Sequence, residues 1–162
     1  MIPFSGQHPF SLTSSRRPAV RFVAVCLFLL AIAPVQAVGE GDAILGVWTL
    51  PDGQTKIEIH PCSESKKYCG RIAWLQEPNS ADGQPRVDER NPNPKRRSVS
   101  VMGMEVLWGL TFAEGKWTDG QYYHLAEGKT YKCVIEQIEP GKLQVHSFVG
   151  IAALGKSQIW TR

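Results

Sequence analysis

The chain has 162 residues with 18 Lys and Arg against 15 Asp and Glu, a formal net charge of +3. The excess lies entirely in Arg16, Arg17 and Arg21, and no acidic residue precedes Glu40, so the rest of the chain is formally neutral. Because this part of the chain is neutral, it has no electrostatic reason to bind nucleic acid or an anionic membrane surface, and we predict neither as a partner.

The first 37 residues have the pattern of a secretory signal peptide. The three arginines precede an apolar run over residues 22–33, which is shorter than the roughly 20 residues that a membrane span needs. Val35-Gln36-Ala37 then supplies small residues at the positions that signal peptidase reads. We predict cleavage after Ala37, with a cut after Ala33 as the less favoured alternative. The mature chain, 38–162, is then a single domain without a membrane span, periplasmic or secreted.

The mature chain has the pattern of a series of strands. Apolar and polar residues alternate with a period of two, and no segment of about a dozen residues shows the 3.6-residue period of a helix. Glycine and proline separate the runs, as in Pro51-Asp52-Gly53, where both residues suit a tight turn. The predicted strands cover residues 44–50, 55–60, 70–75, 105–112, 117–124, 129–138, 143–148 and 157–162.

These runs predict an all-β fold, a small up-and-down antiparallel barrel of about eight strands. An exposed sheet edge ending in Ile159-Trp160 would promote aggregation, so we expect the last strand to pair with the first. Trp48 and Arg162 would then meet at the seam, with the guanidinium over the indole face. We therefore assign Gly46, Trp48, Trp160 and Arg162 to barrel closure. A barrel of this size is about the smallest that encloses one small ligand.

Three of the four cysteines lie in the mature chain. Cys62 and Cys69 flank a polar reversal, and an exported protein meets oxidising conditions, so we predict a local disulfide between them. Closing this short loop would stabilise the fold by about 2.5 kcal/mol. Cys133 shares one strand face with Tyr131 and Ile135, which favours a buried, inert thiol over a reactive one. No CxxC pair or histidine cluster accompanies the cysteines, so we predict no metal and no cofactor.

Residues 76–103 form a long loop rich in proline, glycine and charge. A connection of this length inside a compact domain is usually functional or disordered. In a structural interpretation, Asp88 and Asn91 accept backbone N–H bonds and Arg96 or Arg97 pairs with Asp88, which pins the loop over one barrel mouth. In a functional interpretation, Arg96 and Arg97 form a fork for a carboxylate or phosphate at that mouth. The near-equal supply of both charges favours the structural interpretation.

Six spaced motifs follow one another through the mature chain: Gly46-Val47-Trp48, Cys69-Gly70-Arg71-Ile72, Asp88 with Asn91-Pro92 and Arg96 to Gly103, Gly128-Lys129-Thr130-Tyr131, Phe148-Val149-Gly150 with Gly155, and Trp160-Thr161-Arg162. Together they resemble the exported bacterial family known as domain of unknown function 2147. The resemblance implies a small secreted β-barrel, similar to the lipocalin and calycin group, without an established activity. The chain departs from the family pattern around Tyr123-His124-Leu125, where an acidic residue and a proline are typical. It departs again at His146-Ser147, where arginine and glycine are typical.

Two functions without catalysis remain open. In the first, the barrel interior holds a small apolar or amphipathic molecule of the cell envelope, with Trp74, Trp108 and Tyr131 as candidate lumen residues, unless such side chains simply fill the space. In the second, the 76–103 loop contacts an envelope protein in an interaction or maintenance role. We do not expect an enzyme, because the sequence has no G-x-S-x-G, H-E-x-x-H or phosphate-binding glycine motif.

Overall fold

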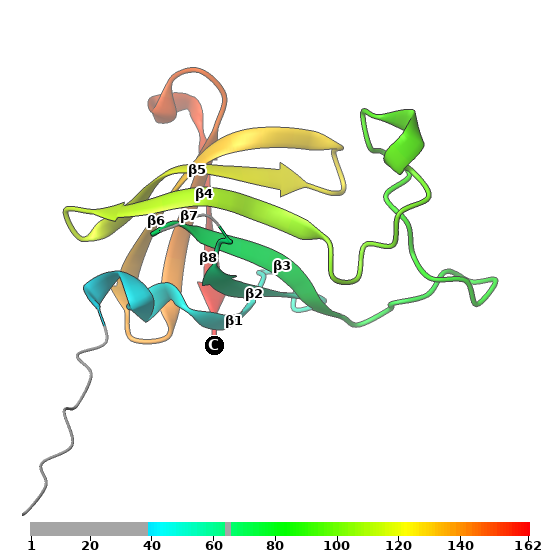
Figure 1. Cartoon of the computed structure of the whole chain (residues 1–162), viewed down its shortest axis with the longest axis horizontal. Coiled ribbons are helices and arrows are strands. Elements are labelled where there is room, and N and C mark those ends of the chain that lie inside the picture. The colour runs from blue at the N-terminus through cyan, green and yellow to red at the C-terminus, as the bar shows by residue number, and fades with distance from the viewer. Residues whose placement is uncertain (1–38, 64–65) are drawn as a thin grey trace, which may run out of the picture. The chain divides into compact units, whose positions relative to one another are not determined.

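The computed structural model describes residues 39–63 and 66–162, so the predicted cleavage site lies outside the described residues. Eight antiparallel strands form a closed barrel in sequence order (Figure 1), which confirms the predicted fold. The described part of the chain contains no helix with the length and apolarity to cross a membrane. The elements are η1 (Glu40–Ile44), β1 (Gly46–Thr49), β2 (Thr55–Pro61), β3 (Tyr68–Leu75), η2 (Pro94–Arg96), β4 (Glu105–Ala113), β5 (Lys116–His124), β6 (Lys129–Glu139), β7 (Lys142–Phe148), η3 (Ala152–Leu154) and β8 (Lys156–Thr161).

The strand alternation places one row of side chains inside the barrel. On β2, Ile57 and Ile59 are buried, and on β7, Leu143 and Val145 are buried, while their sequence neighbours are more exposed. Successive residues of a strand point to opposite faces, so the period of two in the sequence sorts apolar side chains inward.

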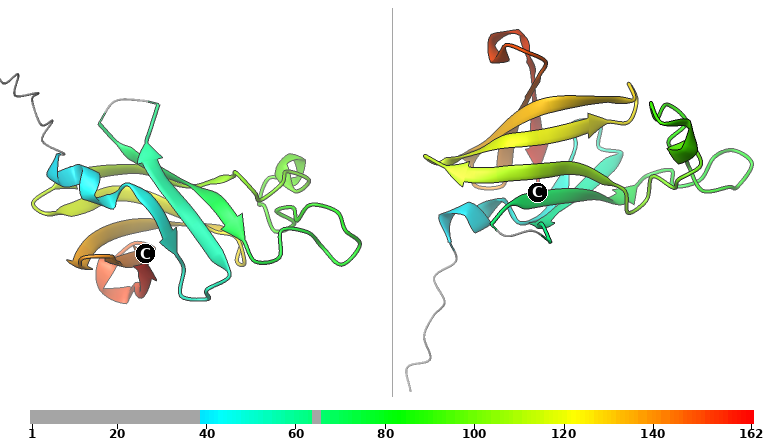
Figure 2. Two further views of the ribbon diagram at one scale, coloured as in Figure 1. Left: turned by 90° about the horizontal axis from the view of Figure 1, so that it is seen from below. Right: turned by 45° about the horizontal axis from the view of Figure 1, so that its top comes forward.

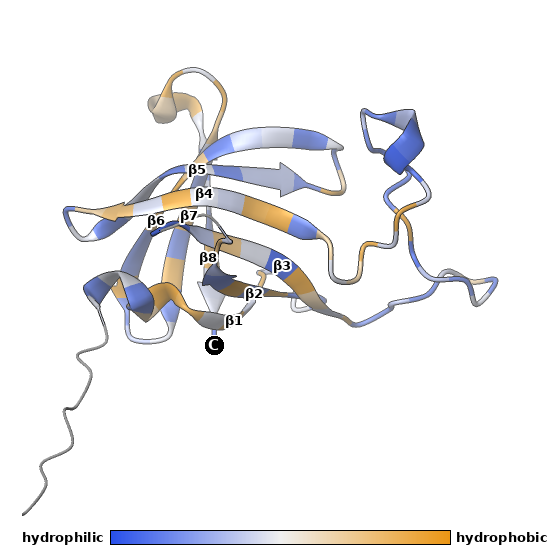
Figure 3. Ribbon diagram, viewed as in Figure 1, coloured by the Kyte–Doolittle hydropathy of each residue, from blue (hydrophilic) through white to orange (hydrophobic). Residues whose placement is uncertain are grey.

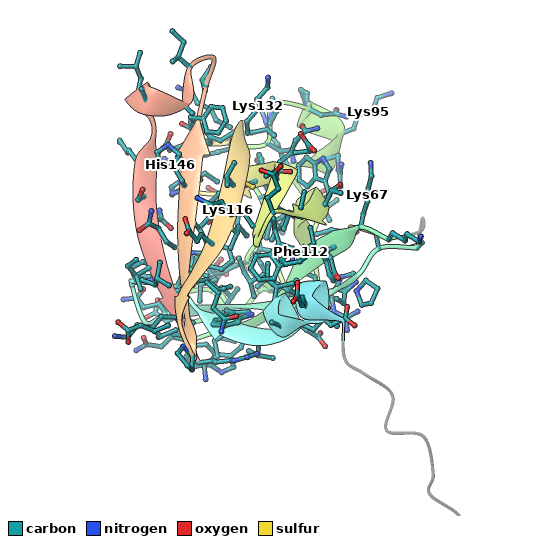
Figure 4. All side chains as sticks on the ribbon, turned by 90° about the vertical axis from the view of Figure 1, so that its left-hand side faces the viewer. Lys67, Lys95, Phe112, Lys116, Lys132 and His146 are labelled. Atoms are coloured by element: carbon teal, nitrogen blue, oxygen red, sulfur yellow. A yellow bond between two sulfur atoms is a disulfide. The ribbon has the colours of Figure 1, made fainter. Side chains whose placement is uncertain are left out.

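One end of the barrel is plugged by η1 and by indole rings. The Nε1 atom of Trp48 donates to the Ile44 carbonyl at 2.7 Å, and Nε1 of Trp117 donates to the Gly41 carbonyl at 2.9 Å. Phe112 lies beside η1 (Figure 4), where a Cβ added to Gly41 would be 3.0 Å from its Cβ. Because Trp48, Trp117 and Trp160 are all fully buried, this half of the lumen is solid.

The barrel closes through a short seam between β8 and β1 (Figure 2), where Thr49 pairs with Thr161. The Arg162 guanidinium lies 4.3 Å from the centroid of the Trp48 ring. It donates to the Leu45 carbonyl at 2.9 Å and to the Ala43 carbonyl at 3.4 Å. Gly46 has a φ of 115°, a region that suits glycine. The seam therefore combines this one strand pair with a cation–π contact and two hydrogen bonds to backbone carbonyls, all three made by the Arg162 side chain.

The cysteines lie as the sequence indicates, and the predicted disulfide between Cys62 and Cys69 is present. Cys133 is a free thiol that is buried in the hydrophobic core of the barrel. Burial raises the pKa of this thiol to about 12. A group that ionises only at such a pH is a poor nucleophile near neutrality.

The prediction that Trp74 faces the lumen is wrong. Its side chain is 40% exposed, and the Lys56 ammonium lies 5.2 Å from its ring centroid on the outer surface. The reason is an irregularity in the β2–β3 ladder, where Ile57 pairs with Ile72 but Lys56 pairs with Trp74. The extra β3 residue reverses the alternation, so Leu75 points inward in place of Trp74.

Candidate functional site

The open end of the barrel holds a cavity of about 560 Å³, which we call the mouth cavity. It lies among the β1–β2 turn, the β5–β6 turn and the 76–103 loop. The lumen is thus filled at the η1 end and hollow at the other end. Its floor is apolar and includes Leu50, Ile57, Ile72, Leu75, Val101 and Val106, and its rim carries the charged side chains of Asp52, Glu77, Arg86, Asp88, Glu89 and Arg90.

The 76–103 loop is an ordered strap along this mouth. The bridge Val87↔Ser100 joins its two arms, and the bridge Asn79↔Pro85 closes a smaller turn within the first arm. The Gly103 amide donates to the Ile72 carbonyl at 2.9 Å, which fixes the returning arm to β3. The Oδ1 atom of Asn93 accepts from the Lys95 amide at 3.1 Å and caps the short turn η2. Backbone pairing of this kind holds the loop in one place relative to the cavity.

Asp88 attaches the strap to the barrel wall. Its side chain is buried, with 2% relative exposure. Its Oδ2 atom accepts hydrogen bonds from Asn91 Nδ2 at 2.6 Å and from the Tyr123 hydroxyl at 2.8 Å. Burial and then the bond to Asp88 raise the pKa of Tyr123 to about 12, so the hydroxyl stays a donor near neutrality. The pair links the loop to β5 across 35 residues of sequence.

A second attachment joins the strap to the β5–β6 turn. The Arg90 guanidinium donates to the Ala126 carbonyl. Gly128 has a φ of 64°, and a Cβ added there would be 2.1 Å from the Arg90 carbonyl oxygen. Only glycine allows two backbones to approach this closely at a positive φ. This is the physical role of the glycine in the Gly128-Lys129-Thr130 motif.

The predicted pairing of Arg96 or Arg97 with Asp88 is wrong. Within residues 39–63 and 66–162, no Lys, Arg or His nitrogen lies within 4.0 Å of the Asp88 carboxylate. The Nε atom of Arg97 donates instead to the Asn91 carbonyl at 2.9 Å. Arg96 lines a different hollow, of about 810 Å³, on the outer wall beside Asn91 and Trp108. The fork predicted at the barrel mouth is therefore also absent, and Arg86 and Arg90 take that position.

The chain thus combines a closed eight-stranded antiparallel barrel with a 3₁₀ plug at one end and a cavity at the other. A family model described as "Uncharacterized protein conserved in bacteria (DUF2147)" matches residues 46–162. The chain belongs to this family.

One solved structure shows the same fold. It is described as "Protein HP1028 from the human pathogen Helicobacter pylori belongs to the lipocalin family", with a TM-score of 0.60 and 24% sequence identity. The match covers 73% of this chain and 81% of that chain. This likeness shows that the chain has the same fold as that protein. None of the curated proteins matches the chain.

The two other candidate lumen residues of this DUF2147 chain lie at different places. Tyr131 faces inward at the open end, where it lines a smaller cavity of about 200 Å³ together with Phe148 and Lys156, and its hydroxyl donates to Glu127. The prediction that Trp108 faces the lumen is wrong, because its neighbour Leu107 is fully buried and adjacent strand residues face opposite sides; Trp108 pairs with the exposed Gln121 and lines the outer hollow. Neither residue lines the mouth cavity.

Sequence reasoning missed several residues of the mouth, above all Tyr122 and Tyr123. Both are buried, Tyr122 within the lumen and Tyr123 beneath the strap. The alternation on β5 indicates that one of two adjacent tyrosines faces inward. No local pattern shows that the other is covered, because its cover comes from Asp88 in a distant loop.

Proposed function

We propose that the chain is an exported binding protein without catalytic activity, and that the mouth cavity holds a small amphipathic molecule of the cell envelope. The observation that carries the proposal is the cavity of about 560 Å³ with an apolar floor and a charged rim. Sites for small molecules typically measure about 300–1,000 Å³ and combine apolar walls with a few convergent polar groups. A fully apolar ligand would leave the charged rim without a partner, so the lining favours an amphipathic one.

The proposed location rests on two observations. The Cys62–Cys69 disulfide is of a kind that persists in oxidising compartments. The sequence before residue 38 has the pattern of a signal peptide. We therefore assign the protein to the periplasm or the secreted fraction.

Native mass spectrometry of the protein isolated from its own envelope tests the proposal. We expect a bound small molecule on the wild type. Leu125→Trp adds a large side chain at a half-buried position that lines the mouth cavity, and we expect it to lose the bound molecule. Val47→Trp makes the same addition on the outer surface of β1, where Val47 is exposed, and should keep it. Wild-type protein without any bound molecule would overturn the proposal.

A second candidate function is contact with another envelope protein, and one surface favours it. Val149, Ile151 and Leu154 of the β7–β8 loop are 71%, 67% and 81% exposed, and they form an apolar tip (Figure 3). Exposed apolar patches often mark interaction sites. Replacing all three by serine should abolish co-purification of a partner if this tip makes the contact. Deletion of residues 82–95 tests the 76–103 loop in the same way.

A further inference from the structure

Two buried polar atoms at the mouth cavity have no hydrogen-bond partner. Within the part of the chain that the structure describes, the unpartnered buried side-chain atoms are Oδ1 of Asp88 and Nδ1 of His124. Asp88 and His124 line the mouth cavity, and His124 also lines the smaller cavity of about 200 Å³ together with Glu127. His124 Nδ1 is 3.6 Å from Glu127 Oε1, which is longer than a hydrogen bond. Buried polar atoms without partners are uncommon in folded proteins, and the Asp88 oxygen is the one whose residue lines the mouth cavity alone, which points to a ligand there.

The Asp88 carboxylate is satisfied on one side only. Its Oδ2 atom accepts from Asn91 and Tyr123. Asn91 and Tyr123 line the outer hollow, while Tyr123 and Asp88 both line the mouth cavity. Oδ1 is the oxygen of this cavity-lining carboxylate that has no partner within the described residues. An isolated buried carboxylate is costly unless a cation or a hydrogen-bond donor pairs with it.

The charges of the rim favour a cation at this place. Two arginines line the mouth cavity, and the guanidinium of Arg90 already donates to the Ala126 carbonyl. The carboxylates outnumber the arginines: Asp52, Glu77, Asp88 and Glu89 against Arg86 and Arg90. An acidic surplus around a partly enclosed cavity raises the local concentration of cations and opposes anions.

We infer that the ligand of the mouth cavity is an amphipathic amine, whose ammonium group donates a hydrogen bond to Asp88 Oδ1. Its apolar body lies on the floor formed by Ile57, Ile72 and Val106. The inference rests on the proposed function and names the chemical class that this function serves. It gives Asp88 a binding role in addition to its structural bond to Tyr123.

Isothermal titration calorimetry of the full chain with octylamine, octan-1-ol and octanoate tests the inference, because these probes share one alkyl chain and differ in the head group. We expect octylamine to bind about tenfold or more tighter than octan-1-ol, as a charge-assisted bond provides. Octanoate should bind most weakly. Asp88→Asn keeps an oxygen that accepts from Asn91 and Tyr123, and it removes the charge. We expect it to lower the affinity for octylamine about tenfold and to leave that for octan-1-ol unchanged.

Tyr123→Phe is the matched control, because it removes a bond to Oδ2 and leaves Oδ1 and its charge in place. We expect this variant to keep the preference for octylamine. If Asp88→Asn and Tyr123→Phe lose octylamine equally, Asp88 acts only by holding the loop, and the inference is overturned.

The inference and the proposed function fail on different results. Equal affinity for octylamine and octan-1-ol, or an envelope-derived ligand without an amine, overturns the inference and leaves the binding function in place. If no probe binds and the envelope-derived protein carries no molecule, the binding function itself is overturned.

Discussion

Arg162→Ala tests the seam between β8 and β1. The substitution removes a guanidinium 4.3 Å from the Trp48 ring and a 2.9 Å hydrogen bond to the Leu45 carbonyl. The cation–π contact contributes about 1 kcal/mol at a partly exposed site. A hydrogen bond from a charged group contributes about 1.5 kcal/mol at the low end of its range, which suits an exposed arginine. The bond to Ala43 at 3.4 Å adds little. The free energy of unfolding should therefore fall by about 2–3 kcal/mol.

Thermal unfolding followed by circular dichroism measures this loss. For a domain of this size each kcal/mol lowers the midpoint by about 3–5 °C, so we expect a fall of roughly 6–15 °C. Arg162→Lys keeps a cation near Trp48 and loses the forked geometry, so its midpoint should lie between those of the wild type and Arg162→Ala.

Arg71→Ala is the control for Arg162→Ala, because it breaks an exposed pair with Glu58 at 2.8 Å. Exposed pairs of this kind contribute at most about 1 kcal/mol. If Arg162→Ala lowers stability no more than Arg71→Ala does, the cation–π contact does not hold the seam.

Three further predictions concern a loop glycine, the free cysteine and the disulfide. Gly128→Ala should displace the strap and lower the melting midpoint more than Gly115→Ala does. Both glycines have a positive φ, but of the two only Gly128 would place an added Cβ against a backbone atom. Equal effects would show that the contact with Arg90 is unimportant. Cys133 has a pKa raised to about 12 from an ordinary 9.0, so the stability that its neutral thiol provides is complete below pH 9 and is lost as pH rises toward 12. The loss of unfolding free energy should be up to about 4 kcal/mol and absent in Cys133→Ala, measured by urea unfolding at each pH. Replacing Cys62 and Cys69 by alanine should lower stability by about 2.5 kcal/mol, and an unchanged urea midpoint would contradict the chain-entropy account.

The strands were predictable from sequence because their cause is local. Each predicted run from 44–50 to 157–162 agrees within a few residues with a strand of the structure, since alternation and turn glycines act over a few positions. Trp74 is an exception, because the irregular β2–β3 pairing reverses which face its side chain occupies. Such an irregularity depends on the partner strand, and alternation along one strand cannot reveal it.

The mouth was harder to predict because its contacts join distant segments. The sequence identified the 76–103 loop and Asp88 as important, but it favoured arginine as the partner of that carboxylate. Tyr123 and Asn91 take that place. A count of charges suggests ion pairs, whereas the geometry of the strap brings a hydroxyl and an amide to the carboxylate. The resulting shortage of cations around Asp88 is what makes the mouth suitable for a positively charged ligand.

The division of the barrel into a solid half and a hollow half separates stability from binding. The η1 end contains the indole bonds of Trp48 and Trp117 and the guanidinium of Arg162. The opposite end contains the cavity, and its strap is attached through Asp88 and Arg90. Sites this far apart with no shared partners should have additive effects. Combining Arg162→Ala with Asp88→Asn should therefore lower stability by the sum of the single effects, with octylamine affinity equal to that of Asp88→Asn alone. A further loss of affinity in the double variant would show that closure of the seam shapes the mouth.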